Sequence, residues 1–278
     1  MTAIAPAPAF DIGRVISRVF NVLGRNFVTF LLLSVLLVGL PTGAASFLQL
    51  WRVLPMMNGA GGGPPDISRV NDMFAPVSIA ITLATWLIAA GANAVLQGAV
   101  IHGTISDLAG RKATFGECLG AGLRFLLPLI AIGLIAAVCC FFGFLIFLVP
   151  GVLLALAWSV AAPVRVMERT TIFGAFARSV ELTRDCRGAI FGLAIIAGVT
   201  GFIVSMVVGG VTMGGLMASL SNPAGGAFTG MMIAQSIVGL ISQTITALLG
   251  STGVASVYYE LRQVKEGVGA EQLAAVFD

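Results

Sequence analysis

Long uninterrupted apolar segments make up most of the chain, and short charged segments separate them. Residues 125–164 contain no charged side chain, and neither do residues 188–259. The apolar residues follow one another without the alternation typical of a barrel strand, so we interpret them as helices. A helix of about 20 apolar residues crosses a bilayer, in which every backbone amide must be bonded internally.

The apolar segments divide into six predicted spans. A single helix over residues 125–164 would be about 60 Å long, twice the hydrocarbon thickness, so we expect a turn at Pro150-Gly151. Residues 219–229 carry the loop-forming Ser221-Asn222-Pro223 and interrupt the last apolar segment. The predicted spans are 27–50, 76–101, 125–149, 151–167, 189–216 and 230–258.

Three charged segments precede pairs of spans and show a helical period. The cytoplasmic lead, 1–26, places apolar residues from Ile12 onward at helical spacing. The second segment begins at Thr114, and Thr114 with Glu117 fits a capping box. The third begins near Thr171. We therefore predict an all-α integral membrane helical bundle, a single domain over 1–278, with three amphipathic interfacial helices.

Composition and charge distribution agree with this interpretation. Hydrophobic residues make up 58% of the 278 residues and charged residues 10%, against about 25% charged in a typical soluble domain. Of the 15 lysines and arginines, all but Arg52 and Arg69 fall on one side of the predicted membrane. The positive-inside rule places that side in the cytoplasm. We predict a multi-pass membrane protein with both termini cytoplasmic, a tail over 259–278 and no cleaved signal peptide.

Residues that carry chemistry are scarce. His102 is the single histidine, and no nucleophile triad, phosphate loop or HExxH motif occurs. His102 with Asp107 is a weak acid–base candidate, and a local hydrogen-bonding role is the alternative. The four cysteines have no metal-ligand spacing. We expect no enzyme activity, no cofactor and no metal.

The basic residues of the cytoplasmic segments are candidates for anionic lipid headgroups. Ordinary positive-inside charge is the alternative explanation. Glu168 is a candidate for a structural ion pair with Arg178, or with Arg169. We expect membrane lipids as partners and no nucleic acid. The candidate lipid contacts are Arg14, Arg18, Arg25, Arg111, Lys112, Arg178 and Arg184.

Polar residues within the spans are few. They would either line a solute path or form hydrogen bonds between helices. No charged side chain lies deep in a span, so the usual marker of a proton-coupled transporter is missing from the sequence. Small residues at steps of four, such as Gly201 and Gly209, allow close helix packing and a possible homo-oligomer. The polar candidates are Asn93, Gln97, Gln235 and Gln243.

A motif in the second half of the chain resembles a known family. Pro150-Gly151, Trp158, Pro163, Glu168, Ala175, Arg178-Ser179 and Leu182 are followed near the end by 258–262 (YYELR) and 265–267 (KEG). This pattern resembles bacterial proteins grouped with the membrane domain of glycerophosphoryl diester phosphodiesterase, although Glu260 stands where that family has Asp. The resemblance implies a multi-spanning helical protein of a bacterial inner membrane. It does not imply phosphodiesterase activity, which belongs to a separate soluble domain.

Together these patterns favour a non-enzymatic inner-membrane protein with a structural, scaffolding or lipid-interacting role. The alternative function is a transporter or permease-like component for a small or lipidic solute.

Overall fold

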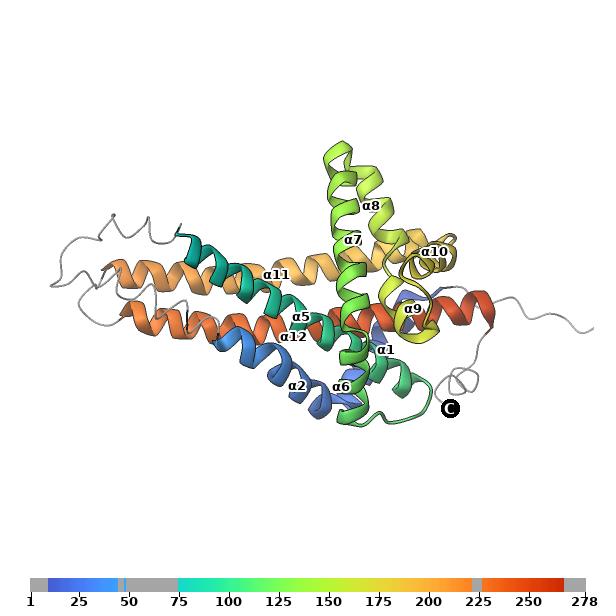
Figure 1. The fold of residues 1–278 in the computed structure, drawn as a ribbon, viewed down its shortest axis with the longest axis horizontal. Helices are drawn as coiled ribbons and strands as arrows, with labels where there is room; N and C mark the ends of the chain where they lie inside the picture. The colour runs from blue at the N-terminus through green and yellow to red at the C-terminus, as the bar shows by residue number, and fades with distance from the viewer. Residues whose placement is uncertain (1–9, 45–47, 49–74, 222–226, 268–278) are drawn as a thin grey trace, which may run out of the picture. The chain divides into compact units, whose positions relative to one another are not determined.

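The computed structural model describes residues 10–44, 48, 75–221 and 227–267, and Figure 1 shows its helices. Within these ranges the chain is helical and contains no strand, which confirms the predicted all-α fold class. The helices are α1 (Ile12–Arg25), α2 (Phe27–Ser34), the π-helix η1 (Val35–Gly39), α5 (Pro76–Leu108), α6 (Phe115–Arg124), α7 (Leu126–Ile146), α8 (Leu148–Ala157), α9 (Ala161–Glu168), α10 (Ile172–Thr183), α11 (Arg187–Ser221) and α12 (Ala227–Glu266).

Six helical segments of the described chain are long and apolar enough to cross a membrane. Their lengths run from 18 to 34 residues. This length and apolar character indicate a multi-pass membrane protein. The segments are Phe27–Ala44, Pro76–Leu108, Leu126–Ile146, Leu148–Glu168, Arg187–Gly215 and Ile233–Glu266.

The turn between the third and fourth spans differs from the predicted one. Phe147, with extended backbone, separates α7 from α8, and Pro150 lies in the first turn of α8. Proline is tolerated there because the first amides of a helix have no partner within it. Gly151 instead permits close packing, since a Cβ at this position would lie 2.6 Å from the Phe144 ring. Figure 1 shows α7 and α8 side by side as a hairpin.

The fourth span is two helices rather than one. A turn at residues 158–160 separates α8 from α9, and the amide of Ala161 bonds the Trp158 carbonyl. The carbonyl of Ala157 accepts hydrogen bonds from α10 instead, at 2.8 Å from the Ser179 hydroxyl and 3.3 Å from that of Thr183. These hydroxyls bond a backbone carbonyl that the break in the helix leaves without a backbone partner.

Three other helices run past the predicted spans, and α11 continues five residues beyond 216, to Ser221. Helix α5 continues seven residues beyond position 101, and α12 continues eight residues beyond 258, into the predicted tail. Residues 259–261 of that segment are buried, and Gly267 follows the helix with a φ of 62°. The predicted ends at residue 50 and within 268–278 lie outside the described residues. Of the loop predicted over 219–229, residues 219–221 and 227–229 are helical instead, and residues 222–226 lie outside the described residues.

The three amphipathic segments form helices at the predicted places, each with a side-chain cap. Asp11 accepts from the amide of Gly13 at 2.8 Å before α1. The Thr114–Glu117 capping box is present at α6, and Thr171 caps α10. Such caps satisfy backbone amides that the first turn of a helix leaves without partners.

The chain divides into two compact units. Unit 1 contains residues 1–33, 94–201 and 246–278, and unit 2 contains residues 34–93 and 202–245. The core of unit 1 includes Ile101, Ile105, Val164 and Tyr258, all less than 1% exposed. The single membrane domain over 1–278 stays a prediction.

Large apolar side chains are exposed in both units. Leu127 and Phe147 in unit 1 are 77% and 73% exposed, and Trp86 in unit 2 is 72% exposed. Continuous apolar exteriors of this kind are suited to lipid and not to water.

Candidate functional site

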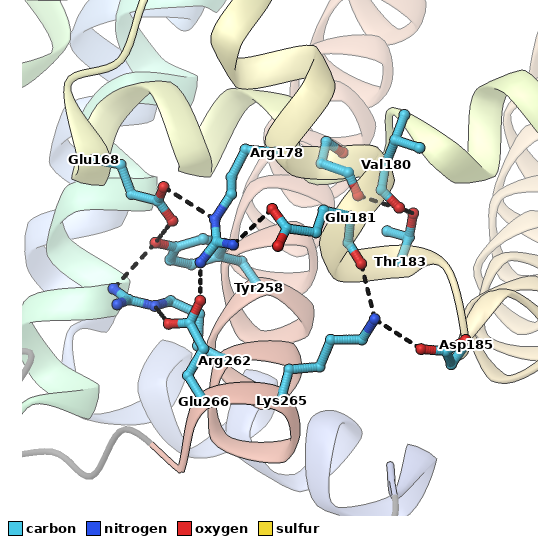
Figure 2. Close-up of polar contacts among 11 residues, drawn as sticks. Glu168, Arg178, Val180, Glu181, Thr183, Asp185, Tyr258, Arg262, Lys265 and Glu266 are labelled. Carbon is cyan, nitrogen blue, oxygen red and sulfur yellow. Dashed lines mark hydrogen bonds and ion pairs between the residues drawn. The ribbon is translucent and has the colours of Figure 1, made fainter.

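Charged side chains of α9, α10 and α12 meet in unit 1 in a network that we name the Arg178 cluster. Figure 2 shows its members pointing toward one another from these helices and from the segment after α10. The cluster consists of Glu168, Arg178, Glu181, Asp185, Tyr258, Arg262, Lys265 and Glu266.

Arg178 is the centre of the cluster. Its guanidinium lies 3.3 Å from the Glu168 carboxylate and 2.9 Å from that of Glu181, and it also pairs with Glu266 of α12. The Glu168–Arg178 contact expected from the sequence is therefore present. The Tyr258 hydroxyl donates to Glu168 at 3.0 Å, so the end of α9 is bound to both α10 and α12.

The rim of the cluster is formed by Lys265 and Asp185. The Lys265 ammonium donates to the Asp185 carboxylate at 2.9 Å and to the Glu181 carbonyl at 2.8 Å. The hydrogen bond from Lys265 and its positive charge lower the pKa of Asp185 below its ordinary value. Since Asp185 is exposed, solvent screens this pair.

A second network, the Glu260 clasp, joins α1 to α12 and consists of Arg14, Arg18, Glu260 and Gln263. The carboxylate of Glu260 is fully buried and lies 2.5 Å from Arg18 and 3.4 Å from Arg14. Arg18 also donates to Gln263 at 2.7 Å. A carboxylate that is withdrawn from water needs such partners, because desolvation disfavours its charge.

Ion pairs engage four of the seven arginines and lysines predicted to contact lipid. Arg14, Arg18 and Arg178 bind the carboxylates described above, and Arg25 binds Asp107 at 2.5 Å. Arg111, Lys112 and Arg184 are exposed. Within the described ranges, Lys112 and Arg184 make no ion pair.

His102 lies in a pocket of about 310 Å³ within unit 1. Helix α5 contributes His102, α6 contributes Glu117 and Arg124, and the end of α9 contributes Arg169. Asp107, the predicted partner of His102, pairs with Arg25 and is not among the lining residues. The lining is completed by Gly120, Ala121, Phe125, Val166 and Met167.

The four polar residues predicted within the spans do not all belong to one unit. Gln97 belongs to unit 1, and Asn93, Gln235 and Gln243 belong to unit 2. Asn93 donates to the Ala89 carbonyl of its own helix at 2.8 Å, and Gln243 is exposed. Their grouping into one cluster stays a prediction.

The described part of the chain holds no group of three or more His, Cys, Asp or Glu side chains placed to bind a metal ion. The four cysteines are free thiols. Burial raises the pKa of the Cys118 thiol to about 11, so this thiol is protonated near neutral pH.

Sequence reasoning did not identify Arg124 as a site residue. It considered Arg169 only as an alternative ion-pair partner of Glu168, and Tyr258 and Glu260 only as residues of the family motif. The available signal was position, since all four lie where an apolar segment meets a charged one. The partners of Glu260 are some 240 residues earlier in the chain, and no local pattern identifies them.

Comparison with protein-family models, with curated proteins and with solved structures gives no match for this chain. The resemblance to the membrane domain of glycerophosphoryl diester phosphodiesterase therefore stays a prediction. Among the residues that carry it, Glu168, Arg178, Tyr258 and Arg262 belong to one cluster.

Proposed function

We propose that this chain is a non-enzymatic multi-pass protein of a bacterial inner membrane, with a scaffolding role that includes binding of anionic lipids. One observation carries the proposal. Ion pairs and hydrogen bonds join the ends of α5, α9 and α12 to α1 and α10 within unit 1. Since charged residues lie outside the hydrocarbon layer, these ends belong to one membrane surface.

The positive-inside rule supports the cytoplasm as the side of this surface. Exposed Lys112 and Arg184, which make no ion pair in the described chain, support an attraction to anionic headgroups. The side-chain amide of Asn93 donates a hydrogen bond to its own helix, and this weighs against the alternative of a transporter, since a solute path needs polar groups that remain available.

Lipid analysis of the purified full chain tests the proposal. Extraction in mild detergent should retain phosphatidylglycerol and cardiolipin above their share in the source membrane. A Lys112→Gln/Arg184→Gln variant should retain less, at about fivefold lower affinity for each charge removed. A matched variant, Arg262→Gln, changes an arginine that already pairs with Glu266, and it should keep the wild-type lipid profile. Bulk lipid composition in the wild-type sample would contradict the proposal.

A further inference from the structure

The pocket around His102 has a charged wall and an apolar wall. Arg124, Arg169 and His102 present cationic or hydrogen-bonding groups, and Glu117 adds one carboxylate. Phe125 and Met167 belong to the apolar wall, with Ala121 and Val166. Its volume of about 310 Å³ lies at the lower end of the range for small-molecule sites. This lining suits a ligand that carries an anionic group on an apolar body.

The two lining arginines differ from the arginines of the networks. Arg124 and Arg169 are exposed and, in the described chain, neither forms an ion pair with a carboxylate. Arg178 and Arg18 are occupied by Glu168, Glu181, Glu266 and Glu260. The pocket thus gathers basic groups whose charge the protein does not neutralise.

Glu117, the carboxylate in the pocket, also caps helix α6. Glu117 accepts a hydrogen bond from the Thr114 amide at 2.8 Å and completes the capping box of α6. This hydrogen bond lowers the pKa of Glu117, so the side chain is ionised at neutral pH. A third cation lies close by, because the Arg165 guanidinium lies 5.4 Å from the centroid of the Phe125 ring. Its Nε atom is buried without a hydrogen-bond partner in the described chain. The local charge is therefore positive.

The position of the pocket favours a lipid headgroup as the source of the anionic group. Its lining comes from the last two turns of α5, from the junction of α6 with α7, and from the end of α9. Each is the end of a spanning segment next to charged residues. In the proposed orientation, on which this step rests, that is the depth of the lipid headgroups.

We propose that the pocket between α5, α6 and α9 binds the phosphate group of an anionic phospholipid. Arg124 and Arg169 bind the phosphate oxygens, and guanidinium groups suit this contact because they offer paired N–H donors. Phe125, Val166 and Met167 contact the apolar part of the lipid next to the headgroup.

Native mass spectrometry of the full chain in detergent tests the proposal, with dioleoyl phosphatidic acid, dioleoyl phosphatidylcholine and inorganic phosphate as separate probes. We expect the phosphatidic acid to bind at least tenfold more tightly than the phosphatidylcholine. Arg124→Gln and Arg169→Asn should each weaken it about fivefold. Asparagine is chosen because residue 169 has a φ of 50°, a conformation that asparagine tolerates.

The Glu117→Gln variant provides a second test, because a purely structural role of Glu117 would not make phosphatidic acid bind more tightly when its charge is removed. Glutamine preserves the capping box but removes the negative charge, so binding of phosphatidic acid should strengthen by a few fold. The matched control Arg262→Gln, at an arginine that pairs with Glu266 outside the pocket, should leave the affinity unchanged.

Wild-type affinity in both arginine variants would overturn the proposal, and so would weaker binding in Glu117→Gln. Inorganic phosphate binding as tightly as the lipid would overturn the lipid as the source. The pocket proposal and the proposed function fail in different measurements. The pocket variants can bind phosphatidic acid with unchanged affinity while anionic lipids remain enriched on the purified chain. Loss of that enrichment with pocket binding retained would contradict only the broader role.

Discussion

Glu260 is the residue whose environment departs most from the pattern of the sequence. It is a carboxylate with no exposed side-chain surface, between Arg14 and Arg18 of a helix at the other end of the chain. A buried ion pair is weak evidence of net stability, but removal of one partner leaves an uncompensated charge and is costly.

We predict that Glu260→Gln destabilises the protein by about 2 kcal/mol, less than for a fully buried pair because both arginines reach solvent. The measurement is the melting temperature in detergent, with denaturation in SDS as a second probe. The double variant Arg18→Gln/Glu260→Gln should lose less than the sum of the two single losses. Additive losses would show that the two side chains act independently.

Cys118 provides a prediction of pH dependence. Its thiol is fully buried and its pKa is raised to about 11, so about one molecule in a thousand carries the thiolate at pH 8. In a variant that keeps only this cysteine, maleimide labelling of the folded protein should be slow at pH 8. The rate should rise about tenfold per pH unit up to about pH 11, since the thiolate is the reactive form. A rate at pH 8 equal to that in SDS would contradict the burial.

For single residues, the sequence identifies which side chains are charged but not which side chains they pair with. The Glu168–Arg178 contact is predictable because ten residues and one turn separate the two side chains. The Glu260 clasp is not, because it depends on how α1 packs on α12. The same difficulty applies to the pocket, whose residues come from three helices.

Among the helices, the α7–α8 hairpin depends most clearly on one small residue. A Cβ at Gly151 would lie 2.6 Å from the ring of Phe144 and 2.8 Å from its backbone nitrogen, whereas a Cβ at Gly133 would meet no atom within 4 Å. We predict that Gly151→Ala destabilises the protein by about 1–3 kcal/mol, because the backbone of the hairpin must move apart. Gly133→Ala is the matched control and should leave the melting temperature unchanged. Equal melting temperatures for the two variants would show that the hairpin does not depend on close contact at Gly151.

The helices themselves were largely predictable, and their ends were not. Apolar length located the spans, and the Thr114–Glu117 capping box located the start of α6. Helical spacing located α1 from Ile12 onward, and the third segment was placed near Thr171, which caps α10. Pro150 was misinterpreted as a turn because the first turn of a helix tolerates proline. The end of α12 was placed too early because the charges after Tyr259 resemble a solvated tail, although packing on α1 buries that segment.

Across the whole molecule, we propose that six spans leave the basic segments on one side of the membrane. The ion pairs support it independently of composition, because they join α1, α10 and the ends of α5, α9 and α12 within unit 1. An odd number of crossings between these segments would place partners such as Glu168 and Glu266 on opposite faces, where Arg178 could not contact both.

Topology mapping of the full chain tests this claim most directly. Paired reporters that are active either inside or outside the cytoplasm would be inserted after residues 58, 111, 147, 184, 222 and 278. We expect cytoplasmic signals at 111, 184 and 278 and external signals at 58, 147 and 222. An external signal at 111 or 184, or a terminus opposite to these segments, would contradict it.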